Sequence, residues 1–340
     1  MASASATSAR RGGGALAAGA CASGLVAWIA TGEVAADARA KQLERLRQFS
    51  EFGVRRMPAR EFSLATFDRP VVITGLIDDW PARRTWSFGA LRSRIGQALV
   101  DCGSLCNDGL PFYAVAYNAG RQPGRCDTDL YVFDADFSET SGKASLLDDW
   151  RPLDILSSSD VFSIGEAATH PDRPHWRWML AGPPGSGSPM HKDPWVYSSW
   201  NASLVGSKRW ILFPPDIPRV VLHPPQQGIV GSFFTALGLP GYRSAADFMD
   251  EVLPTLREGG LGHVEVLQCP GEVVAFPAGW WHAVVNLDAT IAVTESFGEP
   301  CNLEAIVRTL SEGNLKAFAD VLLAENRQSL ESRIGSCPVA

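Results

Sequence analysis

Two stretches far apart in the chain each read as short strands joined by turns, and each carries side chains that bind metals. The first runs from His191 to Pro215 and begins with a His-Lys-Asp tripeptide, whereas the second runs from Gly271 to Phe297 and carries His282. Residues two apart on an extended strand leave the same face, so His191 and Asp193 can reach one ion together. A third ligand must then come from a distant strand, and this requirement favours a closed all-β architecture.

A set of two histidines and one carboxylate suits two metals. Two histidines and one carboxylate on one face of an ion leave three positions open, which is the arrangement of non-haem Fe(II) oxygenases. Zinc also binds such a set. The ligand types alone therefore leave both metals open.

A lysine is expected deep in the same fold. Residues 200–205 and 208–213 both read as strands, and the intervening Gly206-Ser207 pair predicts a tight hairpin with a glycine-first turn. On the second strand Lys208 shares a face with Trp210 and Leu212. A lysine among apolar neighbours must pair with an anion or lose its charge. Only five of the 30 basic residues are lysines, which favours a compact charge fitted to a site.

The motifs of these stretches together resemble a Jumonji C (JmjC) domain. They are the HxD tripeptide, a Trp-Asn strand, Gly-x-Lys-x-Trp-x-x-x-Pro-Pro, and Gly-Glu-x-x-x-x-Pro-x-x-Trp-x-His-x-Val-x-Asn-Leu followed by Thr-Ile-Ala-Val. The resemblance is dense over residues 165–298, and residues 70–86 are similar to the segment that precedes such cores. Within the family, the chain is most similar to the branch of the arginine demethylase and lysyl hydroxylase.

The resemblance implies a mainly β fold with flanking helices, namely a double-stranded β-helix, or jelly-roll barrel, of the cupin type. It implies Fe(II) held by the triad, with 2-oxoglutarate and O₂ as co-substrates. The residues that match family positions facing 2-oxoglutarate are Lys208, Thr294, Tyr131, Asn201 and Ser188. The implied activity is hydroxylation of a protein side chain, either of lysine or arginine or of an N-methyl carbon, which then leaves as formaldehyde.

Two other functional classes are compatible with parts of this pattern. A zinc-dependent cupin isomerase or hydrolase would use the same triad but has no need for Lys208 and Thr294. A catalytically silent JmjC-like binding protein would be expected to lack a ligand, and none is missing. Identification of the bound metal would distinguish the first class from an iron-dependent oxygenase. Measurement of turnover would distinguish the second class from an active enzyme.

The chain is expected to divide into four parts. Residues 1–32 read as a targeting or anchoring segment, 33–164 as helices and strands that precede and pack on the barrel, 165–298 as the catalytic core, and 299–340 as a helical segment. The apolar run at 13–30 suits a membrane anchor, a secretory signal or an organelle transit peptide, so the compartment stays open between these and the cytoplasm or nucleus.

Helices are predicted over 35–49, over 87–95 with Ser87 as the cap, and over 302–323. The last of these either closes the barrel end or pairs with a second subunit as a homodimer. A net charge of −7 argues against direct nucleic-acid binding. Seven scattered cysteines, including Cys102, Cys106 and Cys126, indicate neither a disulfide framework nor a zinc site.

Overall fold

The computed structural model describes residues 54–102, 110–119, 130–135, 137, 142–223 and 244–333. The expected targeting segment at 1–32, the predicted helix over 35–49 and two of the cysteines, Cys106 and Cys126, lie outside the described residues. Within the described part, no helix is long and apolar enough to cross a membrane.

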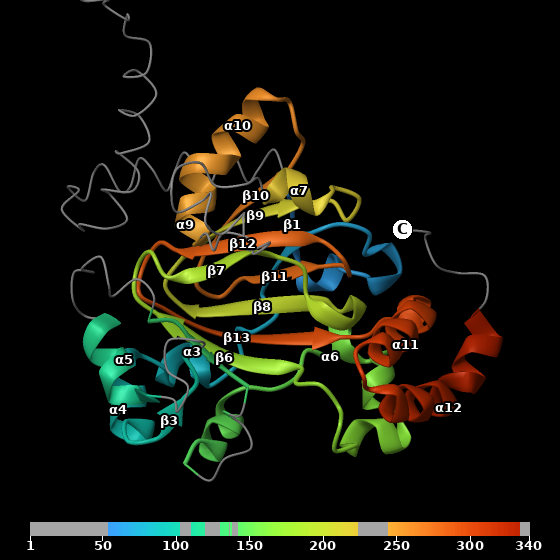
Figure 1. Ribbon diagram of the computed structural model, residues 1–340. Coiled ribbons are helices and arrows are strands. Elements are labelled where there is room, and N and C mark those ends of the chain that lie inside the picture. The colour runs from blue at the N-terminus through green and yellow to red at the C-terminus, as the bar shows by residue number, and fades with distance from the viewer. Residues whose placement is uncertain are drawn as a thin grey trace, which may run out of the picture.

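Two β-sheets face each other and form the sandwich that the sequence predicts (Figure 1). The larger sheet contains, in spatial order, β1 (Arg55–Pro58), β2 (Val71–Thr74), β11 (Val273–Phe276), β8 (Ser198–Val205), β13 (Thr290–Phe297), β6 (Arg177–Gly182) and β5 (Val132–Asp134). The smaller sheet contains β10 (Val264–Gln268), β9 (Lys208–Phe213), β12 (Trp281–Asn286) and β7 (Gly187–His191). A separate pair joins β3 (Leu99–Val100) to β4 (Leu110–Pro111). The cupin-type double-stranded β-helix is confirmed.

Side chains alternate between the interior of the sandwich and its outer faces. Between the sheets, Trp210 and Leu212 of β9 meet Phe276 of β11 and Val284 of β12. The alternate residues of the same strands face outward and are also buried, because helices cover both sheets. This explains why β9 and β12 are buried along their whole length and mostly apolar on both faces.

The predicted hairpin between β8 and β9 is wrong. β8 pairs with β11 and β13 in the larger sheet, whereas β9 pairs with β10 and β12 in the smaller one. The glycine itself was interpreted correctly, since Gly206 has a φ of 73° and an added Cβ would lie 2.4 Å from the carbonyl oxygen of Ala289. A period of two tells which residues point inward, but it does not tell which strand becomes the neighbour.

The outer face of the larger sheet packs against the amino-terminal half of the chain. The helices there are α3 (Ala82–Thr85), α4 (Phe88–Ile95), α5 (Phe112–Ala119) and α6 (Asp154–Ser157). The predicted cap of α4 is confirmed, because Ser87 Oγ accepts a hydrogen bond of 3.1 Å from the backbone N–H of Ala90. Short 3-10 helices occupy Ala59–Glu61, Leu64–Thr66, Ala144–Asp149, Val161–Ser163, Gly165–Thr169 and Pro300–Asn302.

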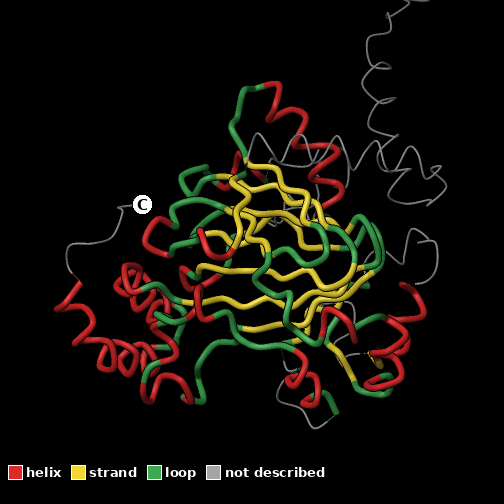
Figure 2. The backbone as a smooth tube through the Cα atoms, turned by 180° about the vertical axis from the view of Figure 1, so that it is seen from behind, coloured by secondary structure: helices red, strands yellow, loops and turns green. Residues whose placement is uncertain are grey.

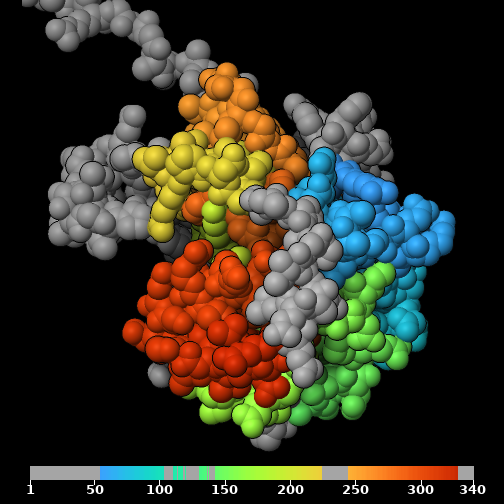
Figure 3. Space-filling view, turned by 90° about the vertical axis from the view of Figure 1, so that its right-hand side faces the viewer, coloured from blue at the N-terminus to red at the C-terminus, as the bar shows by residue number. Residues whose placement is uncertain are grey.

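Helices also cover the smaller sheet and one end of the sandwich (Figure 2). On the smaller sheet they are α7 (Arg219–Leu222), α9 (Ala245–Asp247), a π-helix (Phe248–Val252) and α10 (Leu253–Glu258). At the end lie α11 (Leu303–Glu312) and α12 (Lys316–Arg333), so the predicted carboxy-terminal helices are confirmed as two. In Figure 3, which faces this end, the surface is hollowed between the red carboxy-terminal helices and the yellow segment around α7.

Candidate metal centre and co-substrate pocket

The three predicted ligands meet at one end of the smaller sheet. His191 ends β7 and lies directly opposite His282 of β12, with ring centroids 4.1 Å apart. Asp193 Oδ1 lies 3.5 Å from Nε2 of His191 and 3.7 Å from Nε2 of His282. One ligand atom from each residue falls within 4.8 Å of the others, so a single ion can contact all three. Asp193 itself is not on a strand, because β7 stops at His191 and the carboxylate returns from the following turn.

Backbone carbonyl groups fix the orientation of both imidazoles. Nδ1 of His191 lies 2.7 Å from the carbonyl oxygen of Pro189, and Nδ1 of His282 lies 3.2 Å from that of Trp280. A carbonyl oxygen can only accept, so each Nδ1 carries the proton and each Nε2 offers its lone pair to the site.

The electrostatics favour the protonation states that a metal needs at two of the three ligands, His282 and Asp193. Burial lowers the pKa of His282 to about 4. Burial opposes the charge of Asp193, but His282, His191 and the Ser199 hydroxyl outweigh it and lower the pKa of Asp193 to about 2. His282 is therefore a neutral imidazole and Asp193 an ionised carboxylate at neutral pH, as metal binding requires. At His191 burial also opposes the charge, but the hydrogen bond and charge of Asp193 outweigh it and raise the pKa of His191.

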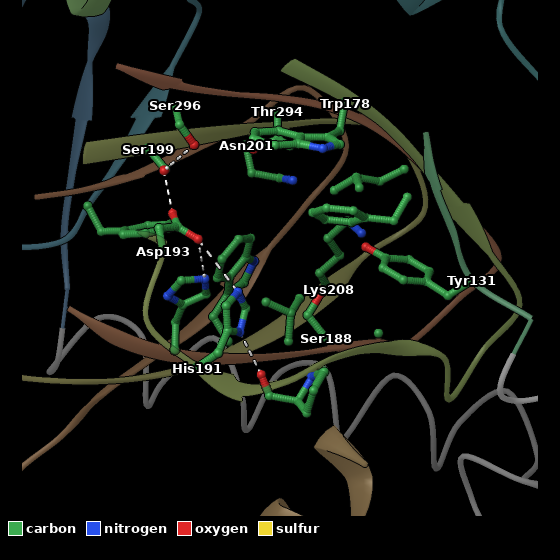
Figure 4. Close-up of a pocket in the computed structure, with 18 of the residues that line it drawn as sticks. Tyr131, Trp178, Ser188, His191, Asp193, Ser199, Asn201, Lys208, Thr294 and Ser296 are labelled. Atoms are coloured by element: carbon green, nitrogen blue, oxygen red, sulfur yellow. Dashed lines mark hydrogen bonds and ion pairs between the residues drawn. The ribbon is translucent and has the colours of Figure 1, made fainter. Parts of the chain in front are cut away.

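Two serines of the larger sheet orient the carboxylate, and the sequence interpretation missed both. Ser199 Oγ donates to Asp193 Oδ2 and lies 2.8 Å from Ser296 Oγ (Figure 4). A signal for them existed, because Ser199 lies two residues before Asn201 and Ser296 two residues after Thr294, on the same inward faces. Loss of such a hydrogen-bonded partner of a ligand typically weakens metal binding about 10- to 100-fold.

A cavity of about 770 Å³ extends from the metal ligands to Lys208. Its walls include all five residues predicted to face 2-oxoglutarate: Ser188, Asn201, Lys208, Thr294 and Tyr131. In Figure 4 the metal ligands lie at one side of the cavity and Lys208 with Tyr131 at the other. The remaining wall is mostly apolar and aromatic.

Lys208 is fully buried at the closed end of this cavity. Its Nζ donates to Asn286 Oδ1 at 2.8 Å and to Thr290 Oγ1 at 3.3 Å, and no carboxylate of the described residues pairs with it. Burial lowers the pKa of Lys208 to about 7. A buried ammonium held only by neutral oxygens is a site for an anion, because an incoming carboxylate would compensate the lost hydration.

The other predicted pocket residues are placed around the same space. Asn201 is buried, and its Oδ1 has no hydrogen-bond partner among the described residues. Thr294 Oγ1 donates to the carbonyl oxygen of Trp200 at 2.5 Å, which leaves the hydroxyl free to accept. The Tyr131 hydroxyl hydrogen-bonds to Ser188, and burial raises the pKa of Tyr131. A buried lysine without a carboxylate partner among the described residues, in the same cavity as a two-histidine, one-aspartate set, fits a dicarboxylate and Fe(II).

The triad is the one group of potential metal ligands among the residues that the structure describes. The remaining described histidines belong to no such group among the described residues. Cys102 is buried on the wall of the cavity and forms no disulfide.

Comparison with known proteins gives the family. Residues 58–301 match the model of the cupin-like domain, a range that reaches from the end of β1 to the residues before α11. The chain belongs to the cupin-like domain family. This range includes β2 and β5, so the cupin-like match extends well before residue 165, where the dense JmjC motifs begin.

Curated relatives confirm the resemblance to JmjC proteins. The chain is 32% identical over 279 residues to the bifunctional arginine demethylase and lysyl-hydroxylase psr-1 of Caenorhabditis briggsae, covering 79% of this chain and 66% of the relative. It is 31% identical to the arginine-specific demethylase JMJ22 of Arabidopsis thaliana, over 73% of this chain and 46% of that protein. It is 27% identical to the 2-oxoglutarate and iron-dependent oxygenase JMJD4 of Mus musculus, over 68% and 56%. The matches thus span about half to two thirds of these relatives.

Proposed function

We propose that the chain is an Fe(II)- and 2-oxoglutarate-dependent dioxygenase that hydroxylates a side chain of a protein. One observation carries the proposal: a single cavity holds a two-histidine, one-aspartate triad at one side and, at the other, the buried Lys208 without a carboxylate partner among the described residues. The names of the relatives support it, because they include iron- and 2-oxoglutarate-dependent oxygenases, arginine demethylases and lysyl hydroxylases.

Each part of the cavity would have a separate task. His191, Asp193 and His282 would hold the iron on one side and leave its other positions to 2-oxoglutarate and O₂. The bound iron and 2-oxoglutarate would supply the oxidising chemistry, which protein side chains cannot provide. Lys208 would bind the distal carboxylate of 2-oxoglutarate by a charge-assisted contact, with Asn201 beside it. The Thr294 hydroxyl would donate to the same carboxylate only after turning away from the carbonyl oxygen of Trp200.

The chain's own residues also orient the reactants and exclude water. Ser199 holds the Asp193 carboxylate, and the carbonyl groups of Pro189 and Trp280 hold the two imidazoles. The rings of Trp210 and Phe276 lie 5.9 Å apart on the inner wall and keep that side of the cavity apolar. A dry wall protects a reactive centre from side reactions with solvent.

The apolar wall favours a long side chain with an aliphatic stem as substrate. The rings of Phe133 and Trp178 lie 5.4 Å apart on the cavity wall, and Phe133 is partly exposed. Such a pair can contact the methylene groups of lysine or arginine and can also attract their cationic ends. Hydroxylation of a carbon in the stem and hydroxylation of an N-methyl group are the same chemistry on different carbons.

The test is an anaerobic titration of the full chain with Fe(II) and 2-oxoglutarate, followed by visible absorption. A chelated 2-oxo acid gives a metal-to-ligand charge-transfer band, which we expect in the native chain and, much weaker, in Lys208→Ala. Asp193→Ala should bind no stoichiometric Fe(II). Absence of the band, with zinc bound instead, would favour a zinc-dependent cupin.

Turnover separates an oxygenase from a binding protein that is silent. Peptides rich in lysine, arginine and their N-methylated forms, incubated with iron, 2-oxoglutarate and air, should gain one oxygen atom or lose a methyl group by mass spectrometry. Succinate should form in step with the modified peptide. A chain that gives the absorption band but modifies none of these peptides would contradict the assignment of lysine and arginine as substrates.

A further inference from the structure

The turn that follows the metal ligand Asp193 has a strained backbone. In the 3-10 turn Pro194–Val196, Trp195 has a φ of 59° and a ψ of 19°, and Val196 has a φ of 58°. This left-handed region disfavours every residue with a Cβ, and most of all a β-branched one such as valine. Two such residues in succession persist only where the surrounding structure holds them in place.

The carboxy-terminal helices hold this turn. Trp195 and Val196 pack against the apolar cluster that α11 and α12 form with Phe162 and Tyr197. Gly313, which ends α11, lies directly under the indole: an added Cβ would lie 2.5 Å from Cη2 and Cζ3 of Trp195. The φ of Gly313 is −85°, so its backbone does not require glycine. The indole ring is therefore the main obstacle to a side chain here, since the next atom, the carbonyl oxygen of Thr309, would lie 3.3 Å from the added Cβ.

The same turn controls where the Asp193 carboxylate can lie. Asp193 immediately precedes Pro194, and the backbone N–H of Tyr197 donates to the carbonyl oxygen of Pro194 at 3.2 Å. Beyond the turn, the Tyr197 ring packs on Phe162 at 5.0 Å. The turn is therefore fixed by its own hydrogen bond, by Tyr197 and by the Trp195 indole. If the indole moves, the strained residues can relax, and Asp193 moves with them.

We propose that α11 and α12 act as a clamp that holds the metal ligand Asp193 in place. Trp195 is the positioning residue, and its indole ring packs against Gly313. The helices contribute no ligand, yet their packing sets the geometry of the metal site and hence its affinity. Any partner or modification that shifts α11 against the barrel then changes metal retention. The inference rests on the proposed metal function, and the experiment distinguishes a failure of the clamp from a failure of metal binding.

Two glycines of this chain provide a matched comparison. Gly313 and Gly259 both end helices, and both have ordinary negative φ values, −85° and −73°. An added Cβ at Gly259 would meet only the carbonyl oxygens of Thr255 and Leu256, at 3.4 and 3.5 Å. Alanine is therefore tolerated by the backbone at both positions, and only Gly313→Ala displaces the Trp195 ring.

The measurement is a titration of the full-length variants with Co(II), followed by its visible d–d absorption, which reports both affinity and coordination geometry. We expect Gly313→Ala to weaken Co(II) binding by about 10-fold or more and to change the band shape, as for other groups that orient a ligand. Gly259→Ala should stay within about twofold of the native affinity, since distant sites act independently. Trp195→Ala should weaken binding like Gly313→Ala, and the double variant should lose no more than either single one.

Each outcome decides between the two proposals. If the native chain binds neither Co(II) nor Fe(II), the proposed metal function is wrong. If the native chain binds and Gly313→Ala binds equally well with the same spectrum, the clamp is wrong. If Gly313→Ala does not fold, Trp195→Ala and Trp195→Phe decide: native affinity in Trp195→Ala refutes the clamp, and loss in Trp195→Ala with recovery in Trp195→Phe supports it.

Discussion

Binding of 2-oxoglutarate should be accompanied by proton uptake at Lys208. Burial lowers the pKa of this lysine to about 7, and no carboxylate of the described residues compensates it. A group with a pKa near 7 is about nine-tenths neutral at pH 8 and about nine-tenths charged at pH 6. A bound carboxylate raises that pKa again, because it favours the charged form. We therefore expect an uptake of about 0.9 proton per 2-oxoglutarate at pH 8, about 0.5 at pH 7 and about 0.1 at pH 6.

Isothermal titration calorimetry measures this number directly. 2-Oxoglutarate is titrated into the Mn(II)-loaded chain at each pH in two buffers of different ionisation enthalpy, and the slope of the observed enthalpy gives the protons exchanged. Mn(II) holds the histidines and the aspartate in fixed protonation states. Tyr131 contributes nothing below pH 9, because burial raises its pKa.

Lys208→Arg is the matched control, because an arginine keeps its charge at every pH used. Residual binding to this variant should show the same proton exchange at pH 6 and pH 8. Tight binding to the native chain at pH 8 without proton uptake would refute the reasoning, since Lys208 would then be charged before the ligand arrives or would not contact its carboxylate.

Three further changes have defined outcomes. Because the pKa of Lys208 is lowered in the folded chain, the metal-free protein should lose stability as the pH falls from about 10 to 7. Lys208→Met should abolish this pH dependence of stability. After allowing for two lost hydrogen bonds, it should raise the free energy of unfolding at pH 7 by about 2 kcal/mol, measured by urea denaturation. Ser199→Ala should weaken Co(II) binding about 10- to 100-fold in a competition titration, since Asp193 loses its orienting donor. Arg209→Met should lower the free energy of unfolding by up to about 3 kcal/mol in the same assay, because it breaks a buried 2.7 Å pair and leaves Glu265 with its ion pair to Arg257, and a variant as stable as the native chain would contradict this.

Strand positions followed from the sequence wherever a run of inward and outward residues was bounded by glycine or proline. β9 begins and ends at the predicted residues 208 and 213, and Ser87 caps α4 as expected. These features are local, since they depend on residues within one or two turns of each other. The convergence of His191 and His282 was predictable for a different reason: both must reach one ion.

The errors concern contacts that no local pattern encodes. Gly206 led to a correct prediction of the backbone conformation but to a wrong prediction of the strand pairing. Which strands pair depends on packing across the whole sandwich. The position of Asp193 in a strained turn depends on Trp195 meeting Gly313 more than one hundred residues later in the chain. The partners of Lys208 likewise come from β12 and β13, where an asparagine and a threonine look like ordinary strand residues.

The chain passes from the larger sheet to the smaller one through only Gly206 and Ser207. An insertion in a link this short would move Lys208 relative to Asn201. The length of the link therefore fixes the shape and size of the cavity at its base. At the opposite end of β9, residues 214–263 intervene before the next strand begins. Insertions there leave the base untouched. The two ends of β9 therefore differ in what they constrain: the short link fixes the depth at which Lys208 lies, whereas the long connection on the other side leaves that depth unchanged.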